Sequence, residues 1–281
     1  MKQFLKKALL GVVALPLAIC LSTGVASAEK IRIALAETPS DELAAFFVAL
    51  DRAKANGLDY EWTAFSDEEL AIQAVLSGQM DIGFGTPYSA MQRSKAPLRI
   101  VFQLSKLKFF PVTTKKYDSL NDMNGEPILL HSRGGGTDSI ANVIEDRMGI
   151  TFGDRSYVPG SSNRVAALLG GRADATIIDL SNKNKLMRSE AADSFNVLEM
   201  FEVEASDEAL FGNLDWIKEN EADVAIFVNA LVSTWQDMHE DPTIIRRETN
   251  PDGPIGELPQ EILAELDGFY SDAVAGGLYD P

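Results

Sequence analysis

Two stretches of the sequence repeat one pattern, and the repeat limits the folds that the chain can adopt. Residues 74–85 read AVLSGQMDIGFG and residues 167–178 read ALLGGRADATII, 93 positions later. Each combines the end of a helix, a glycine turn, an acidic residue (Asp81 or Asp174) and an apolar strand. The repeat predicts two lobes built alike, although a common way of packing helices on sheets would also produce it. In register, Thr86 corresponds to Asp179, and each follows the carboxyl end of a strand, where open α/β sheets bind ligands.

Strands and helices alternate along the chain, which predicts an α/β fold. Leu43, Phe46, Phe47 and Leu50 recur at the spacing of a buried helix face. The same periodicity predicts helices over 216–235 and 259–274. A chain in which strands alternate with helices favours parallel strand pairs with helices on both faces of the sheet. Apolar strands are expected at 31–35, 58–65, 80–85, 98–104, 127–130, 155–158, 173–178 and 195–203.

A glycine-rich stretch is the best candidate for a ligand loop. Residues 131–148 read HSRGGGTDSIANVIEDRM and follow a short apolar strand. Gly134, Gly135 and Gly136 allow a tight turn, and Thr137 or Asp138 can cap the helix that follows. Because a helix start carries unpaired N–H groups and a partial positive charge, an anionic or strongly polar group is expected to dock here. The alternative is a capped connection that binds nothing, and the loop alone does not decide between the two.

The N-terminal segment predicts export. A basic start is followed by an apolar run over 8–21 and by the small-x-small pattern Ala26-Ser27-Ala28, which is typical of a signal peptide cleaved near Ala28. The run is short and contains Pro16, so a permanent membrane helix is not expected. The 253 remaining residues contain no cysteine, and because the signal removes three lysines the net charge changes from −17 to −20. This acidity argues against nucleic acid or anionic lipid as a partner, and the export signal predicts a secreted or periplasmic protein.

Residues for catalysis or metal binding are scarce. His131 and His239 are the only histidines, and the chain has neither an HxxxH pattern nor a cysteine cluster. We therefore expect no metal and no cofactor. The sequence also lacks a GxSxG motif and a Cys/His pair. The protein is therefore not expected to be an enzyme.

Four segments together resemble the solute-binding proteins of bacterial ABC importers. They are DIGFGTP at 81–87, SLNDMNGEPILLHSRGGGTD at 119–138, the GRAD turn at 171–174 and WIKENEADVAIFVNAL at 216–231. The chain looks most similar to the branch that includes nitrate, alkanesulfonate, taurine and thiamine-precursor binders. Asp41 and Glu42 depart from the first loop of many relatives, which argues against a simple sulfonate or nitrate ligand.

The resemblance implies a two-lobed α/β periplasmic-binding-protein fold, type II-like, with two crossovers between the lobes. The first lobe would contain residues 29–107 and 206–281, and the second lobe residues 108–205. A monomer would capture a small-molecule solute and present it to an inner-membrane ABC permease. Alternatives are an enzyme on the same fold, such as one of thiamine-pyrimidine synthesis, and the ligand-binding subunit of a sensory system. The implied ligand-binding residues are Thr38, Ser40, Asp41, Ser66, Thr86, Tyr88, Arg133, Gly134, Gly135, Gly136, Thr137, Asp138, Ser161, Ser162, Asn163 and Asp179.

Several of these residues also have a purely structural interpretation. Arg133 could make a forked contact to an anion or stay solvated. Ser161, Ser162 and Asn163 could bind ligand oxygen or only cap a helix. Tyr88 could form an aromatic wall or pack inside the first lobe. Asp179 could hold an ammonium or hydroxyl group, or cap the helix that follows.

Overall fold

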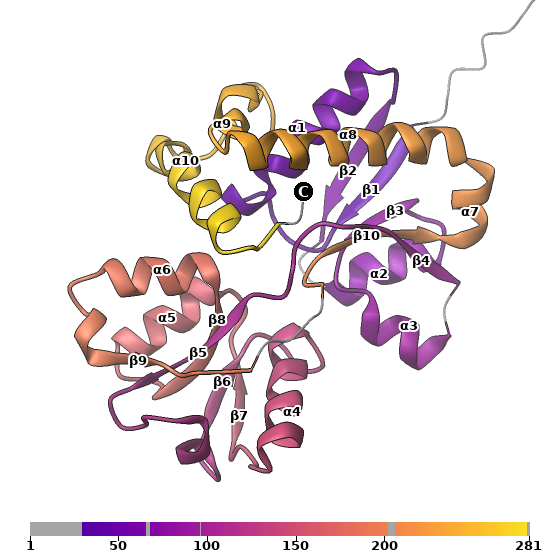
Figure 1. Ribbon diagram of the computed structural model, residues 1–281. Coiled ribbons are helices and arrows are strands. Elements are labelled where there is room, and N and C mark those ends of the chain that lie inside the picture. Colours follow the sequence, from indigo (N-terminus) through magenta and orange to yellow (C-terminus); the bar gives the residue numbers. More distant parts are fainter. Residues whose placement is uncertain (1–29, 66–67, 96, 202–205, 280–281) are drawn as a thin grey trace, which may run out of the picture.

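The first of two sheets has the strand order β2-β1-β3-β10-β4 (Figure 1). The computed structural model describes residues 30–65, 68–95, 97–201 and 206–279, so the predicted signal peptide and Ser66 lie outside the described residues. β1 pairs in parallel with β2 and β3, whereas β10 pairs antiparallel with β3 and β4. The strands are β1 (Ile31–Leu35), β2 (Tyr60–Ala64), β3 (Ile82–Gly85), β4 (Leu98–Gln103) and β10 (Ala209–Asn213).

The second sheet has the order β7-β6-β8-β5-β9 and repeats the plan of the first. β6 pairs in parallel with β7 and β8, and β5 pairs antiparallel with β8 and β9. β3 and β8, the strands of the repeated sequence pattern, each occupy the middle of their sheet, so the prediction of two similar α/β lobes is confirmed. The strands are β5 (Phe109–Thr114), β6 (Ile128–Leu130), β7 (Arg155–Tyr157), β8 (Ala175–Asp179) and β9 (Phe195–Val197).

Helices cover both sheets. In the first lobe they are η1 (Asp41–Leu43), α1 (Ala44–Ala55), α2 (Glu68–Leu76), α3 (Tyr88–Ser94), α7 (Leu214–Glu219), α8 (Glu221–Glu240), α9 (Ile244–Glu248) and α10 (Gln260–Ala275). In the second lobe they are η2 (Leu120–Met123), α4 (Gly136–Met148), α5 (Ser161–Leu169), α6 (Leu180–Arg188) and η3 (Ala192–Ser194). The single helix predicted over 216–235 is two helices, because α7 ends at Glu219 and its C-cap is Asn220, whose side-chain amide donates to the carbonyl oxygen of Trp216.

Two crossovers connect the lobes and lie side by side. Lys106 of the first forms an antiparallel bridge with Ser206 of the second. The N–H of Asp207 donates to the carbonyl oxygen of Ser105 (3.0 Å), and the N–H of Leu104 donates to that of Glu208 (2.9 Å). The indole of Trp235 on α8 donates to the carbonyl oxygen of Leu104 (2.9 Å). The crossovers are therefore anchored to each other and to the first lobe, while the exact lobe boundaries stay a prediction.

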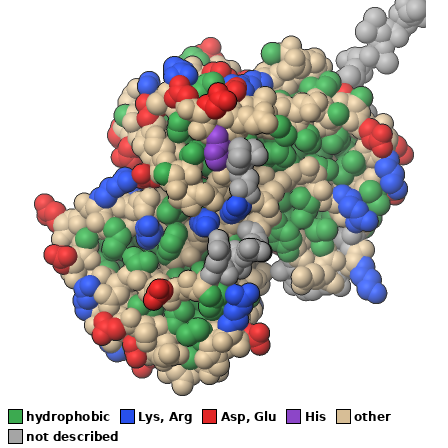
Figure 2. All heavy atoms as spheres, viewed as in Figure 1, with side chains coloured by type: hydrophobic (Ala, Val, Ile, Leu, Met, Phe, Trp, Pro, Cys, Tyr) green, Lys and Arg blue, Asp and Glu red, His purple; other side chains and the backbone are tan. Residues whose placement is uncertain are grey.

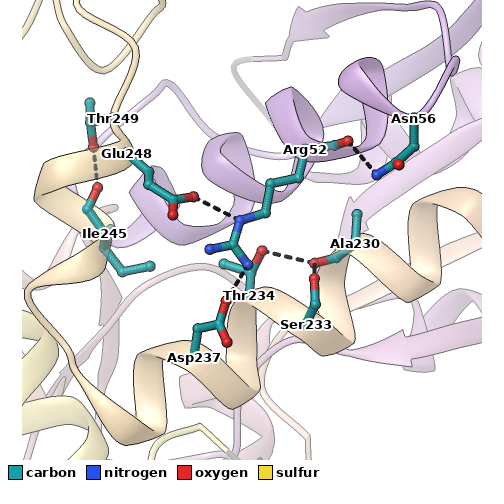
Figure 3. A network of polar contacts seen from close by, with 9 residues as sticks. All are labelled: Arg52, Asn56, Ala230, Ser233, Thr234, Asp237, Ile245, Glu248 and Thr249. Atoms are coloured by element: carbon teal, nitrogen blue, oxygen red, sulfur yellow. Dashed lines mark hydrogen bonds and ion pairs between the residues drawn. The ribbon is translucent and has the colours of Figure 1, made fainter.

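The core of the first lobe is organised around α1. Every residue from Ala44 to Leu50 is buried, so this helix is surrounded rather than amphipathic. Phe46 contacts Phe84 of β3 and Phe227 of α8, with ring centroids 5.0 and 5.8 Å apart. At the far end of α1, Arg52 donates to Asp237 of α8 (2.8 Å) and to Glu248 of α9 (2.7 Å), as Figure 3 shows. α1 thus ties the sheet to the C-terminal helices.

A second contact between the lobes joins α6 to α10. Arg188 pairs with Asp272 (2.5 Å), and Lys185 lies 3.7 Å from both Asp41 and Glu265. Figure 2 shows blue side chains at the left of the waist between the lobes, over the position of α6 in Figure 1. The pairs are partly exposed, and such pairs contribute about 0–1 kcal/mol each. They can bias the lobes towards this arrangement without locking it.

The tight packing of Gly83 against Phe211 gives a test of the first sheet. The two residues are partners on β3 and β10, and a Cβ at Gly83 would overlap the buried ring of Phe211. We expect Gly83→Ala to lower the free energy of unfolding by about 1–3 kcal/mol, because the core must be overpacked. Urea unfolding measures the change. Gly268→Ala is the control: it lies on α10 with no atom within 4 Å of its Cβ, and it should raise stability by up to about 1 kcal/mol. Equal effects of the two variants would contradict this packing.

Candidate functional site

The predicted site residues converge because of the sheet topology. Thr86 follows β3 and Asp179 ends β8, while Asp207 and Glu208 directly precede the antiparallel strand β10. These positions bring strand ends of both lobes to the crossovers. A cavity of about 30 Å³ lies there, with room for about two water molecules, so a larger solute requires the lobes to separate further. It is lined by Glu42, Ser105, Lys108, Asp179, Leu180, Ser181, Asp207, Glu208, Phe269, Leu278 and Tyr279.

Acidic side chains dominate this region. Burial is the main cause that raises the pKa values of the carboxyl groups of Glu42, Asp207 and Glu208 well above the ordinary range. Neighbouring carboxylates add to each shift; for Asp207 they are Glu68 and then Asp179. The acids come from η1, α2, the second crossover and β8, so both lobes contribute. The sequence predicted only Asp41 and Asp179 of this group as ligand-binding residues.

Among these acids, Glu37 is the one whose carboxyl group lacks a hydrogen bond that its burial calls for. It follows β1 by two positions, and its Oε1 atom is buried without a hydrogen-bond partner among the described residues. Burial, followed by the charges of Asp41, Glu68 and Asp179, raises its pKa to about 7. Because Asp179 belongs to the second lobe, Glu37 is influenced by charge across the space between the lobes. The sequence patterns did not single out Glu37, although this residue follows a strand end as Thr86 does.

Thr86 is held by an acid that the sequence analysis also missed. Its N–H donates to Glu68 Oε1 (2.6 Å), and its hydroxyl donates to the same oxygen. Burial and the nearby charge of Asp207 raise the pKa of Tyr88, which is partly buried at the start of α3. On the first loop Thr38 is exposed, Ser40 precedes η1, and Asp41 faces Lys185 of the second lobe. Contact of these side chains with a solute stays a prediction.

The glycine loop has a different cap from the one predicted. α4 begins at Gly136 with Gly135 as its N-cap, so the prediction that Thr137 or Asp138 caps it is wrong. The Thr137 hydroxyl instead accepts the N–H of His131 (2.8 Å). The Asp138 carboxylate accepts the N–H of Gly134 (2.8 Å) and therefore folds the loop back onto its own helix.

Asp138 is part of a compact polar network. Its Oδ1 accepts from the guanidinium of Arg155 (2.8 Å) and from the hydroxyl of Tyr157 (3.2 Å). Burial acts to raise its pKa, but the hydrogen bond from Gly134 and the charge of Arg155 outweigh burial and lower it. The Arg133 guanidinium stacks 5.2 Å from the ring centroid of Tyr157. A carboxylate of the chain thus occupies one N–H donor that the sequence assigned to a ligand.

The start of α4 also faces an acid of the crossover. A Cβ at Gly136 would lie 4.0 Å from Oδ1 of Asp207. A carboxylate near a helix N-terminus is favourable because it meets the positive end of the helix dipole. An anionic solute would have to approach this helix start beside Asp207.

The first turns of α5 and α6 show which of their polar residues cap the helices. Gly160, at φ +82°, is the N-cap of α5, so capping by Ser161, Ser162 or Asn163 is wrong. The Ser161 hydroxyl accepts from the buried Arg164 (2.8 Å). Burial lowers the pKa of that guanidinium to about 10, although Asp179 opposes the shift.

The remaining side chains at these two helix starts have local partners. The Asn163 amide donates to the carbonyl oxygen of Pro159 (2.9 Å), whereas Ser162 is exposed. Asp179 does cap its helix, since its carboxylate accepts the N–H of Asn182 (2.7 Å). Its second carboxylate oxygen accepts from the side-chain amide of Asn182 (2.9 Å). Contact of these residues with a solute stays a prediction.

Two absences hold for the part of the chain that the structure describes. No helix there is long and apolar enough to cross a membrane. Among the same residues, no group of three or more His, Cys, Asp or Glu side chains is placed to hold a metal ion.

Comparison with known proteins gives a family and a fold. A family model described as NMT1/THI5 like matches residues 42–244. A protein from Bordetella bronchiseptica RB50 has a TM-score of 0.68 at 18% identity, over 89% of this chain and 82% of that chain. The alkanesulfonate-binding protein SsuA from Xanthomonas axonopodis pv. citri, bound to MOPS, gives 0.62 at 14% identity, over 85% and 83%. A Candida albicans protein with the generic periplasmic binding protein fold gives 0.63 at 13% identity, over 84% and 79%. No curated protein sequence matches the chain.

The raised pKa of Glu37 predicts how stability depends on pH. The folded protein keeps a proton on this carboxyl up to about pH 7, whereas the unfolded chain loses it near the ordinary value of 4.5. The free energy of unfolding contributed by this group therefore falls as pH rises from about 4.5 to about 7, by roughly 3 kcal/mol in total. Glu37→Gln should remove this loss and be more stable than wild type at pH 8 but not at pH 4.5. Urea unfolding at the two pH values measures it, and equal stability at pH 8 would contradict the burial of an unpaired carboxyl.

The network of Asp138 predicts a structural role for that residue. Asp138→Asn weakens the contact to Arg155 and should lower the free energy of unfolding by about 1–3 kcal/mol. Asp146→Asn, on the exposed face of the same helix, makes the same charge change and should have little effect. Thermal unfolding of both variants measures the difference. If Asp138→Asn is as stable as the control, the carboxylate does not hold the loop.

Proposed function

The chain belongs to the NMT1/THI5-like family, and we propose that it is the substrate-binding component of an ABC import system. It captures a small polar organic solute in the cleft between its two lobes. The observation that carries this proposal is the convergence of polar strand ends from both lobes beside two paired crossovers. A site of this kind forms fully only when the lobes approach each other.

Ligand capture follows from the geometry of the crossovers. The two segments are hydrogen-bonded side by side, so they can act as one hinge. The ion pairs between α6 and α10 are partly exposed and replaceable by water. A solute that contacts both lobes stabilises the closed arrangement by the difference between its affinities for the closed and open states. The arrangement of the two lobes would therefore depend on whether a solute is bound.

Export and delivery complete the proposal. The N-terminal segment carries the pattern of a cleaved signal peptide, which supports a periplasmic location. The closed, solute-loaded monomer would be recognised by an inner-membrane permease. The sequence has no GxSxG motif and no Cys/His pair, which argues against the enzyme alternative. A sensory role would use the same site and differ only in the membrane partner.

A solute screen tests capture. Purified mature protein is mixed with sulfonates, carboxylates, zwitterions, amines and pyrimidines, and thermal unfolding is followed for each. A ligand at about 100 times its dissociation constant should raise the free energy of unfolding by roughly 2.7 kcal/mol. Small-angle X-ray scattering should then show a smaller radius of gyration with that ligand. If no class stabilises the protein, the capture proposal fails.

Gly136→Val tests whether the start of α4 belongs to the cleft. A side chain at this position would extend towards Asp207 without backbone strain, because φ of Gly136 is not positive. We expect the affinity for the solute found in the screen to fall about ten-fold or more, since the valine side chain would fill the space between the start of α4 and Asp207. Unfolding without ligand should change little. Gly149→Val is an unsuitable control because φ there is +67°, so Ser139→Val on the exposed face of α4 serves instead. Unchanged affinity would place the loop outside the site.

A further inference from the structure

One carboxylate between the lobes lacks the partner that its position demands. Glu37 Oε1 is buried and accepts no hydrogen bond from the described residues. It lies beyond the carboxyl end of β1, at the sheet edge where Thr86 and Glu68 meet. Buried acceptors in folded proteins are nearly always paired, and an exception needs an explanation. A donor supplied by a ligand is such an explanation.

The surroundings of Glu37 specify the charge of that ligand. The carboxylates whose charges raise its pKa belong to Asp41, Glu68 and Asp179, and they come from η1, α2 and β8. Glu42 of η1 and Asp207 and Glu208 of the second crossover extend this acidic group.

Cations among the described residues also lie near these acids, and one of them is Lys106, at the bridge to Ser206 of the second crossover. Lys108 lines the cavity and has a partner of its own, Lys185 pairs with Asp41, and the buried Arg164 lies near Asp179. They are fewer than the carboxylates. The space between the lobes is therefore negative wherever these carboxyl groups are ionised, and it then repels an anion.

We propose that the captured solute is an organic cation with N–H donors, an amine or a guanidino compound, which Glu37 binds together with Asp179 of the second lobe and the acids of the crossover. The inference rests on the proposed function and names the solute class of the same site. An ammonium carries three donors and a guanidinium five, so either can satisfy the buried oxygen while offsetting the neighbouring charge. A quaternary ammonium has no N–H to donate.

A metal ion fits the described geometry less well. The carboxylates are spread over both lobes, and no three or more His, Cys, Asp or Glu side chains among the described residues converge on a point. A compact divalent ion needs such convergence, with oxygen ligands at about 2.0–2.6 Å. An extended cation can instead reach several separated acids at once.

Cation binding should depend on pH. Without a ligand, Glu37 keeps a proton up to about pH 7, and the cation must displace that proton. The charged groups around it are Asp41 and Glu42 of η1, Glu68 of α2, Asp179 of β8, and Asp207 and Glu208 of the crossover, with Lys106, Lys108, Arg164 and Lys185 as the opposing cations. Affinity for an amine should therefore rise between pH 5.5 and pH 8, and binding should release protons.

Isothermal titration calorimetry of the mature protein with matched compounds tests the class. The series is 1,4-diaminobutane, guanidinobutane, 1,4-butanediol, butane-1,4-disulfonate, tetramethylammonium, and calcium or magnesium chloride. We expect saturable binding of the amine or the guanidino compound and none of the diol, disulfonate or tetramethylammonium. Glu37→Gln should weaken that binding at least about 30-fold, because a buried charged contact is lost, and should flatten the pH dependence. Glu219→Gln removes an equal charge on the exposed side of α7 and should leave affinity unchanged.

The outcomes separate this inference from the proposed function. Binding of the disulfonate, or of any anion in the screen, without binding of the cations overturns the cation class and leaves solute capture intact. Equal binding of the metal ions overturns it in favour of a metal site. Failure of the amine and the guanidino compound to bind also overturns it. Because Glu37→Gln should be more stable than wild type at pH 8, lost binding there cannot be attributed to unfolding, and Asp207→Asn provides a second variant of the same site.

Discussion

The paired crossovers determine where every other polar group of the site can lie. Residues 104–106 and 206–208 are hydrogen-bonded to each other, and Trp235 fixes the first of them to α8. Because the second crossover runs directly into β10, it delivers Asp207 and Glu208 to the edge at which β1 and β3 end. The antiparallel direction of β10 is thus responsible for the presence of these two acids at the site. A parallel strand in that position would have placed the two acids at the opposite edge of the sheet.

These strands and helices could be predicted from the sequence because the patterns that indicate them are local. The burial of Phe46 and Phe47, the strands β3 and β8 and the placement of Thr86 and Asp179 at the ends of these strands all follow from periodicity and turn residues within a few positions. The first residues of the helices were harder to predict, because a shift of one position changes which residue is the N-cap. Gly135 and Gly160 took the cap positions, and the polar residues after them bonded elsewhere. Thr137 accepts from His131, which only the folded loop brings near.

The acidic cluster could not be predicted for a different reason. Glu37, Glu68 and Asp207 belong to segments that are far apart in sequence, and their meeting depends on the pairing of β10 with β3. The strand-end rule would have selected Glu37, had it been applied to β1 as it was to β3. For Asp207 the rule needs the direction of β10, which no local pattern reveals. Asp138 is the opposite case. Its position in the sequence predicted contact with a ligand, whereas in the folded chain its carboxylate accepts hydrogen bonds from Gly134 and Arg155.

The distribution of acids over both lobes couples charge to motion. When the lobes approach, Asp179 comes closer to Glu37 and Asp207, so closure without a cation either increases repulsion or requires further protonation. Both effects favour a more open arrangement for the empty protein. A cation placed between the acids removes the repulsion and also releases the protons, and it does so only when both lobes contact it. The same charges therefore oppose closure on an empty site and favour closure on a filled one. The weak ion pairs between α6 and α10 can then remain exposed, because the ligand supplies most of the difference in free energy between the two states.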